Sequence, residues 1–297
     1  MIQIKALNRL NSRVKRIEHF GMHVDLVKTS KGVVRIGSMP DISKLLNFHG
    51  FREEIVIVPP WKGSMAGDNH TGEEFVLWNA QVKGSIKKAY VGAPEDLNLI
   101  YRHLDETFSF FFDENRINIV KKRWLKKWFD RQPASPVYEN GSLKILIENQ
   151  NITLTDQGRL LYNQNELEDC CNPDTLVEAV LKKTDRDSHH RPALEIKPIG
   201  TGNGFVGTVA SCVVRFKNQV IWIDPCGYPA HNLARNQVHW DDITHIIVTH
   251  NHEDHVQGFS ACLKRAQKTG RPINLITAPS IYEVLENQFT PLCPDFS

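Results

Sequence analysis

Residues 243–258, which read ITHIIVTHNHEDHVQG, constrain the fold and the chemistry of this chain more than any other stretch. A short apolar run is followed by four polar side chains within six residues: His250, His252, Asp254 and His255. Neutral imidazole and carboxylate are ligands that zinc favours, and they are poor material for a hydrophobic core. Histidines on a solvated turn would account for one of these residues, but not for four. The stretch therefore predicts a buried strand whose end binds metal.

The spacing divides these four side chains between two metal ions. His250 and His252 are two residues apart, so they point the same way on an extended backbone, and we expect them to bind the first ion. Asp254 and His255 follow on an expected loop and are predicted to bind the second. We expect Zn²⁺ at both positions, with Mn²⁺ or iron as alternatives because the same ligand types bind them.

The composition is that of an ordinary globular protein. Charged residues make up 24% and hydrophobic residues 41% of the 297 residues, and the net charge of +2 gives no general argument for nucleic acid or membrane. The six cysteines show no disulfide or zinc-ribbon spacing. No apolar run approaches the roughly 20 residues that span a bilayer, and no signal peptide is visible at the N-terminus. We expect a cytoplasmic protein without a membrane span.

The chain divides into two expected domains. Residues 1–188 are predicted to form an α+β domain of unknown role, with a candidate sub-boundary near residues 133–136, where two prolines interrupt the pattern. Residues 184–191 (TDRDSHHR) hold no apolar side chain and indicate the boundary. Residues 194–297 form the second domain, and no internal repeat is visible in the sequence.

The first domain contains one stretch that suggests a partner. From Lys121 to Arg131 the sequence reads KKRWLKKWFDR, and on a helix its aromatic residues would share one face while the basic residues lie around the other. Such a helix suits nucleic acid, an anionic lipid surface or an acidic partner. The alternative is an amphipathic helix that docks by its tryptophans and leaves a solvated basic side.

Residues 194–297 resemble the N-terminal half of the metallo-β-lactamase superfamily, whose signature is His-x-His-x-Asp-His. The resemblance implies an α/β fold in which an α+β N-terminal domain precedes a partial αβ/βα sandwich. It also implies that Asp224, in IDPCG, supports a ligand histidine from behind. The turn GTGNG at residues 200–204 is similar to a turn of the phosphodiesterase-like and tRNA-processing branches. His252 stands where diiron branches usually place glutamate, which favours hydrolysis over redox chemistry.

The ligand set that the resemblance implies is incomplete. That family adds a further histidine to each site and a bridging aspartate downstream, whereas no histidine follows His255 in this chain. His231, His239 and His245 precede the motif, where the family has no ligand. A catalytic zinc needs three protein ligands, and this chain offers two for each ion. We expect a domain that is incomplete at its C-terminus, completed by missing sequence or by a second polypeptide; a degenerate domain is the remaining alternative.

Two functions follow from these residues. A completed site would be a metal-dependent hydrolase in which two metal ions lower the pKa of a water and Asp254 orients that water as well as holding metal. Its substrate would be a small molecule or nucleotide with an ester, amide, thioester or phosphodiester bond, and the glycine turn favours the phosphodiester. The alternative is a non-catalytic recognition or assembly protein whose functional part is the N-terminal domain and whose partial sandwich is an interaction surface.

Overall fold

The computed structural model describes the C-terminal part of the chain almost continuously and the rest in segments. The described residues are 3–6, 14–29, 32–40, 42–48, 53, 55–57, 88–91, 94–110, 129–132, 137–139, 142–147, 150–155, 160–162, 165–167, 173–184, 193–201, 209–291, 293 and 296.

A mixed seven-stranded sheet forms the N-terminal part. Its strands stand in sequence order: β1 (Gln3–Ala6), β2 (Val14–His19), β3 (Met22–Thr29), β4 (Gly32–Ile36), β5 (Ile55–Ile57), β6 (Lys88–Val91) and β7 (Phe129–Gln132). The first four strands pair antiparallel, and β4 to β7 pair parallel. Helix α1 (Ile42–Phe48) lies between β4 and β5 in the chain, and α3 (Pro94–Phe110) follows β6.

A five-stranded antiparallel sheet and one helix come next. The strands are β8 (Val137–Glu139), β9 (Ser142–Ile147), β10 (Gln150–Thr155), β11 (Leu160–Tyr162) and β12 (Asn165–Leu167). Each strand pairs with its neighbour in the sequence, as short connections favour. Helix α5 (Pro173–Lys183) has proline at its first position and two lysines in its last turn, which suits the helix dipole.

The C-terminal part is a five-stranded mixed sheet with helices on one face. Its strands are β13 (Leu194–Gly200), β14 (Ser211–Phe216), β15 (Gln219–Ile223), β16 (His245–Ile247) and β17 (Asn274–Ile276). The first three are antiparallel, and β15, β16 and β17 are parallel. The helices are α6 (Pro229–Arg235), the 3₁₀ turn η1 (Trp240–Asp242), α7 (Glu253–Val256), α8 (Phe259–Thr269) and α9 (Pro279–Phe289).

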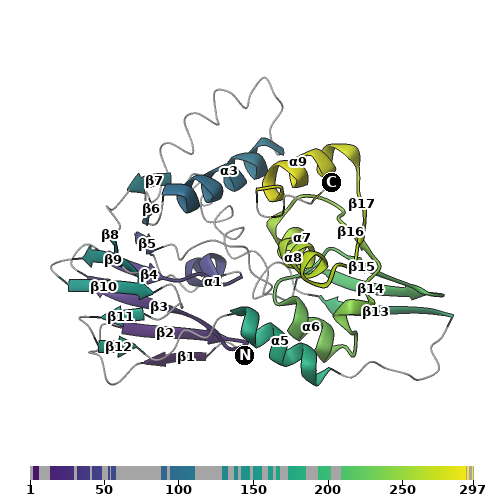
Figure 1. Cartoon of the computed structure of the whole chain (residues 1–297), viewed down its shortest axis with the longest axis horizontal. Helices are drawn as coiled ribbons and strands as arrows, with labels where there is room; N and C mark the ends of the chain where they lie inside the picture. The colour runs from purple at the N-terminus through teal and green to yellow at the C-terminus, as the bar shows by residue number, and fades with distance from the viewer. Residues whose placement is uncertain are drawn as a thin grey trace.

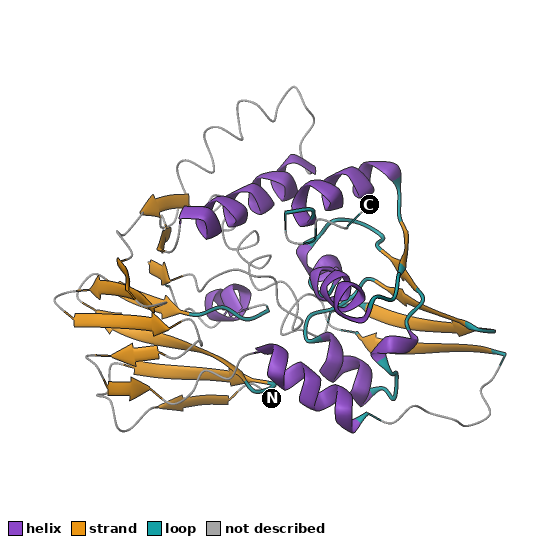
Figure 2. Ribbon diagram, in the orientation of Figure 1, coloured by secondary structure: helices purple, strands orange, loops and turns teal. Residues whose placement is uncertain are grey.

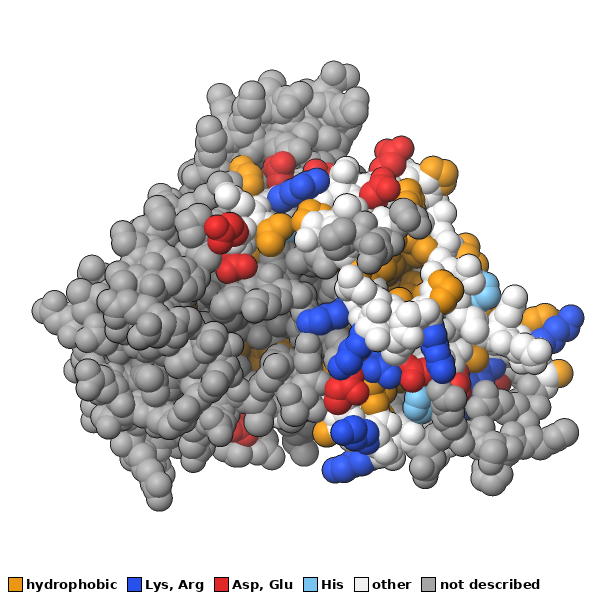
Figure 3. Space-filling view, in the orientation of Figure 1, with side chains coloured by type: hydrophobic (Ala, Val, Ile, Leu, Met, Phe, Trp, Pro, Cys, Tyr) orange, Lys and Arg blue, Asp and Glu red, His pale blue; other side chains and the backbone are white. Residues whose placement is uncertain are grey.

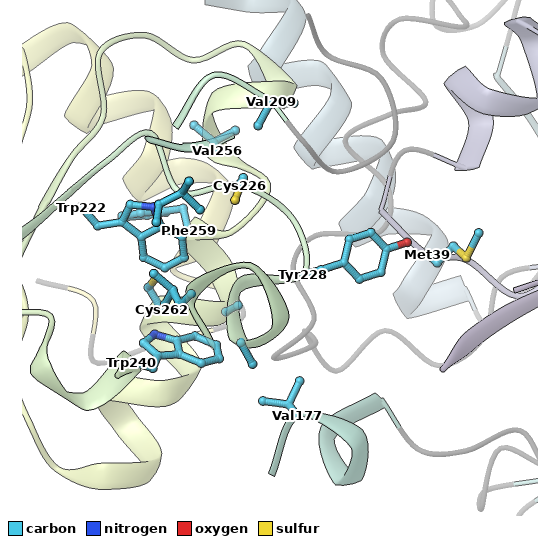
Figure 4. Packing of buried hydrophobic residues seen from close by; sticks show 14 of the residues in the cluster. Met39, Val177, Val209, Trp222, Cys226, Tyr228, Trp240, Val256, Phe259 and Cys262 are labelled. Atoms are coloured by element: carbon cyan, nitrogen blue, oxygen red, sulfur yellow. The ribbon is translucent and has the colours of Figure 1, made fainter. Parts of the chain in front are cut away.

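The helices lie between the N-terminal and C-terminal sheets (Figures 1 and 2). Helix α3 packs against α9, and α5 packs against α6. Arg265 of α8 also joins α5 to the C-terminal part. Two of its nitrogens donate to Asp241, and the third donates to Glu178 of α5 at 3.0 Å. One cluster of buried apolar side chains runs through both parts. Figure 4 shows Tyr228 of the C-terminal part pointing towards Met39 of the N-terminal part.

The two mixed sheets share a topology that the sequence does not reveal. Strands β2 to β6 and strands β13 to β17 both run antiparallel, antiparallel, parallel, parallel. In both, a short helix follows the third strand (α1, α6) and a longer helix follows the fifth (α3, α9). The longer helices are the pair that packs together, so the two halves meet through equivalent elements.

The outer face of the C-terminal sheet is apolar and uncovered by described residues. Four large side chains are exposed there: Leu194 at 56%, Ile196 at 62%, Phe216 at 43% and Ile276 at 48%. The strand register also carries an apolar row across all five strands, formed by Pro198, Cys212, Ile223, Ile247 and Ile276. Soluble monomers rarely leave such a surface open.

The predicted fold class is confirmed: the chain is α/β, with a mixed N-terminal part followed by a sheet that carries helices on one face. Two local expectations were wrong. Phe129, Asp130 and Arg131, expected at the end of a basic helix, lie in strand β7, because they pair with β6. Asp254 and His255, expected on a loop, lie in the helical turn α7. Among the described residues, no helix is both long enough and apolar enough to cross a membrane.

Several expectations fall outside the described residues. They include most of the stretch from Lys121 to Arg131, residues 202–204 of the glycine turn and the expected boundary at residues 185–191. On the face shown in Figure 3, the basic and acidic side chains of the described residues are interspersed rather than gathered into one basic patch.

Candidate functional site

The candidate site lies where two parallel strands end side by side. Ile223 ends β15 and pairs with Ile247, which ends β16, so the residues that follow them meet at one edge of the sheet. Asp224 follows the first strand, and its backbone N–H donates to the carbonyl of Ile247 at 2.8 Å. Val248 and Thr249 follow the second strand and lead into His250. The parallel pairing thus brings an aspartate 26 residues upstream beside the histidines.

Asp224 organises this edge through both of its carboxylate oxygens. Oδ1 accepts from the backbone N–H of Thr249 at 2.8 Å. Oδ2 accepts from the hydroxyl of Thr249 at 2.7 Å and lies 2.9 Å from Nδ1 of His255. Asp224 is 5% exposed, so these bonds replace the water that its charge would otherwise need. Asp224 thus contacts His255 directly, and its role in supporting a metal-ligand histidine stays a prediction.

The three histidine rings lie close together. The ring centroid of His250 is 4.5 Å from that of His252 and 4.0 Å from that of His255, while His252 and His255 are 6.5 Å apart. Asp254 is on the same side, with Oδ2 3.8 Å from Nε2 of His255. His250, Asp254 and His255 are half-buried and His252 is exposed.

The four predicted ligands are neighbours, but they do not form a ready metal cage. Among the described residues, no group of three or more histidine, cysteine, aspartate or glutamate side chains is arranged to hold an ion. The donor chemistry nevertheless suits zinc, because imidazole and carboxylate nitrogen and oxygen atoms are its usual ligands. Metal binding by His250, His252, Asp254 and His255 therefore stays a prediction.

The surroundings favour the neutral form of His250. Burial lowers the pKa of its imidazole, and the neighbouring His255 and His252 lower it further, although Asp224 and Asp254 act in the opposite direction. A ligand imidazole must be neutral to offer a lone pair. The net shift therefore favours the form of His250 that could bind a metal ion at neutral pH.

A glycine allows the histidine segment to lie directly on the aspartate loop. The backbone N–H of Gly258 donates to the carbonyl of Pro225 at 2.8 Å. A β-carbon at position 258 would overlap the carbonyl oxygen of Cys226. Next to it, the side chain of Gln257 accepts from the backbone N–H of Gly227 at 3.3 Å. These contacts fix α7 and the start of α8 against the loop that carries Asp224.

The aspartate loop also rests on the N-terminal part of the chain. The hydroxyl of Tyr228 donates to the carbonyl of Pro40 at 3.2 Å. His19, the last residue of β2, and Phe20, in the turn that follows, lie with their ring centroids 4.9 and 5.2 Å from that of Tyr228. The N-terminal sheet therefore supports the candidate site from behind.

Three other histidines of the C-terminal part lie in different surroundings. His231 stacks on Phe20, with ring centroids 4.8 Å apart. His239 accepts from the backbone N–H of Asp241 at the start of η1. His245 contacts Thr244 through Nδ1 at 2.9 Å. The contacts of these three residues among the described residues are thus with partners outside the cluster.

The sequence did not identify two residues that shape the site. Thr249 links Asp224 to His250, since its Oγ1 lies 2.9 Å from Nδ1 of His250. A threonine directly before the first histidine was the only available signal. Gly258 was noted as a small residue, but its close approach to the backbone at residues 225–226 depends on the folded chain.

Sequence comparison relates the C-terminal part of the chain to known proteins. Residues 194–290 match the model of a family described as Anti-Pycsar protein Apyc1. The ribonuclease Z of Crocosphaera subtropica is 31% identical over 100 residues, which cover 31% of this chain and 32% of that protein. The chain thus matches about a third of the length of that relative.

Comparison of structures finds similar chains at low scores. A metallo-β-lactamase from Cronobacter sakazakii matches 60% of this chain and 72% of its own, with 16% identity and a TM-score of 0.28. The short form of human tRNase Z matches 92% of this chain and 82% of its own, with 9% identity and a TM-score of 0.27. A long-form RNase Z from yeast matches 95% and 46%, with 11% identity and a TM-score of 0.30. Scores this low assign no residue roles.

Proposed function

We propose that this chain carries half of a dinuclear, metal-dependent hydrolase site that acts on a phosphodiester. The observation that carries the proposal is the cluster at the end of β16, where three imidazole rings and Asp254 gather around a network centred on Asp224. Buried carboxylates that orient histidines are the usual support of metal ligands. We propose that each ion is bound by two of these side chains. The first ion is bound by His250 and His252, and the second by Asp254 and His255.

The residues of this chain have separate tasks in the proposed reaction. When bound, two zinc ions would supply a water of lowered pKa and positive charge near the scissile bond. His250, His252 and His255 would hold the metal through neutral imidazoles, and Asp224 would keep His255 oriented from behind. Asp254, half-buried at the edge of the cluster, would share in holding metal and could accept a hydrogen bond from the attacking water, which would help to orient that water.

The comparisons support the choice of a phosphodiester. The match of residues 194–290 to the Anti-Pycsar Apyc1 family fits degradation of a cyclic nucleotide. The curated relative is a ribonuclease by name, and RNA is also a phosphodiester. A phosphodiester bond of a nucleotide is common to both of these substrates, and it defines the substrate class that we propose.

A second sheet is part of the proposed active form. The chain offers two ligands for each ion, whereas a catalytic zinc takes three from protein. The uncovered apolar face of the C-terminal sheet, with Leu194, Ile196 and Phe216 exposed, is contiguous through Ile223 and Ile247 with the residues that carry the cluster. We propose that a second apolar sheet packs on this face, from additional sequence or from another polypeptide, and brings the remaining ligands.

Metal content is the first test of the proposed function. The purified chain is dialysed against zinc and then against buffer, and bound metal is measured by mass spectrometry. We expect zinc to be retained by the wild type and by His245→Ala, a histidine variant outside the cluster. We expect it to be lost from the double variant His250→Ala/His252→Ala. Absence of metal from the wild type would contradict the proposal.

Turnover is the second test, and it separates the candidate substrates. Bis(p-nitrophenyl) phosphate, a cyclic mononucleotide and a short RNA are offered to the zinc-loaded chain after the sequence or polypeptide that carries the second sheet has been added, and the released product is followed. Zinc-dependent hydrolysis of one of them, abolished in the double variant and retained in His245→Ala, is the expected result. Hydrolysis that a chelator leaves unchanged would contradict the metal-dependent mechanism.

A non-catalytic role is the second candidate function. It is favoured by the finding that no three ligand side chains of the described residues converge, and by the exposed apolar sheet face. In that case the partial sandwich is a surface for recognition or assembly. Failure of the wild type to retain zinc, together with a stable folded chain, would favour this alternative.

A further inference from the structure

We propose that Thr249 is a positioning residue that fixes the proton on His250 and thereby decides which ring nitrogen of His250 faces a metal ion. Asp224 contacts His255 directly, whereas it acts on His250 through the hydroxyl of Thr249, which contacts both residues. This inference deepens the proposed function, and its metal-binding aspect rests on that function. Its central claim, the position of a proton on His250, holds for the metal-free chain.

The position of this proton follows from the donors and acceptors around Thr249. The threonine hydroxyl has one proton, and it lies 2.7 Å from Oδ2 of Asp224. An ionised carboxylate can only accept a hydrogen bond, so the hydroxyl proton points to Asp224. The same hydroxyl oxygen lies 2.9 Å from Nδ1 of His250. With its proton already used, Thr249 can only accept there, so Nδ1 of His250 must carry the proton.

The same reasoning applies to the second histidine without an intermediary. Nδ1 of His255 lies 2.9 Å from Oδ2 of Asp224, which can only accept. Nδ1 of His255 therefore also carries its proton. In the neutral form of each ring the lone pair is left on Nε2, and the hydrogen bond at one nitrogen decides which nitrogen can bind metal. One carboxylate thus determines the position of the ring proton on two histidines, which are assigned to different metal ions.

Thr249 is itself held so that its hydroxyl can serve both partners. Its backbone N–H donates to Oδ1 of Asp224 at 2.8 Å, which anchors the residue on the other carboxylate oxygen. Asp224 is buried, while Thr249 is exposed. A change of the threonine side chain therefore removes the link to His250 and leaves the backbone anchor and the bond from His255 in place.

The decisive experiment observes the ring protons directly. Long-range ¹H–¹⁵N spectra of the ¹⁵N-labelled, metal-free chain at neutral pH distinguish a proton on Nδ1 from one on Nε2. We expect His250 and His255 both to carry it on Nδ1 in the wild type. In Thr249→Val, which removes the hydroxyl and keeps the shape, we expect His250 to lose this preference while His255 keeps it. Thr249→Ser restores the hydroxyl and should restore the wild-type pattern at His250.

Zinc affinity gives a second readout. Titration against a chromophoric chelator should show affinity about 10- to 100-fold lower in Thr249→Val, the range typical for loss of a residue that orients a ligand. Thr249→Ser should stay near the wild type. Thr277→Val is the matched control, because the Thr277 hydroxyl donates to the carbonyl of Val248 at 2.8 Å, next to the cluster. Unfolding midpoints of all variants show that each is folded.

The outcomes separate this inference from the proposed function. If wild-type His250 carries its proton on Nε2, or if Thr249→Val leaves its proton on Nδ1, the inference is overturned. If the wild type binds no zinc, the proposed function is overturned, and the spectra alone decide the inference. If Thr277→Val weakens zinc binding as much as Thr249→Val does, the loss of affinity is a general effect of the region and the positioning role is overturned.

Discussion

Gly37 and Asp224 occupy the same position in two sheets of the same topology. Gly37 directly follows β4, the third strand of the set β2–β6, and Asp224 directly follows β15, the third strand of the set β13–β17. Each has a positive φ, 87° for Gly37 and 50° for Asp224. Each backbone N–H donates to the last residue of the fourth strand, Gly37 to Ile57 at 3.3 Å and Asp224 to Ile247 at 2.8 Å. Glycine has no side chain, so the N-terminal sheet lacks at this position the carboxylate that organises the histidines.

Replacing Asp224 with asparagine should separate support of the fold from support of the site. Asparagine tolerates the left-handed backbone, so the variant Asp224→Asn should fold. Its side chain has one acceptor oxygen and an NH₂ group in place of the carboxylate, which meets donors from Thr249 and His255. We expect zinc affinity to fall about 10- to 100-fold in chelator competition. An unchanged affinity would contradict the role of Asp224, and Glu283→Gln on α9 serves as the control.

A methyl group at Gly258 should disturb the site by displacing backbone. Its β-carbon would overlap the carbonyl of Cys226 and lie 2.9 Å from the carbonyl carbon of Pro225, and backbone cannot move aside cheaply. We expect Gly258→Ala to lower the free energy of unfolding by at least about 3 kcal/mol. The comparison is Gly270→Ala, where no atom lies within 4 Å and only the positive φ of 64° is strained. The free energy of unfolding of that variant should fall by only about 1–2 kcal/mol, the cost of a β-carbon on a left-handed backbone. Urea unfolding measures both, and equal losses would contradict the close-approach argument.

The sequence predicts elements whose side-chain pattern is local. Short runs rich in apolar residues identify β14 and β15, and proline at the first position with lysines in the last turn identifies α5. The cluster of His250, His252, Asp254 and His255 is visible for the same reason, since its spacing is short. The strand expected before the cluster is also present, since β16 ends at Ile247, three residues before His250.

Features that depend on distant partners were not predictable. The hydrogen bond between Thr249 and Asp224 joins residues that are 25 positions apart in the sequence. The shared topology of the two sheets lies in the order and direction of their strands, and no residue type marks it. Phe129 was placed in a helix because its local pattern is amphipathic, yet pairing with Lys88 of β6 makes it part of a strand. Tertiary pairing overrides local propensity in such segments.

Removing the hydroxyl of Tyr228 should weaken the contact between the N-terminal and C-terminal parts. Tyr228→Phe keeps the ring against His19 and Phe20 but leaves the carbonyl of Pro40 without its donor. Both groups are buried, so we expect a loss of about 1–2 kcal/mol in the free energy of unfolding. Tyr282→Phe is the matched control, because the Tyr282 hydroxyl bonds Glu286 within one helix, and its loss should cost at most about 0.5 kcal/mol. Similar losses in urea unfolding would show that the Pro40 contact adds nothing.

His19 should make this contact sensitive to acid. The pKa of His19 is lowered from 6.5 to about 4, mainly by burial, with smaller contributions from the positive charges of the N-terminus and His231. Its Nε2 is buried without a hydrogen-bond partner among the described residues, so a proton there has no acceptor. Between pH 6.5 and about 4 the unfolded chain binds a proton at this position and the folded chain does not. Stability is therefore full above pH 6.5 and falls as the pH drops through this window.

The magnitude of this loss can be measured against a variant that does not titrate. A shift of this size corresponds to at most about 3 kcal/mol, and the partial access of water to the ring reduces it. We expect His19→Phe, which can keep the aromatic contacts with Phe20 and Tyr228, to flatten the decline in urea midpoint between pH 6.5 and 4. Burial also lowers the pKa of His231, so a smaller decline of the same sign should persist in the variant. A decline as steep in His19→Phe as in the wild type would assign the acid sensitivity to other groups.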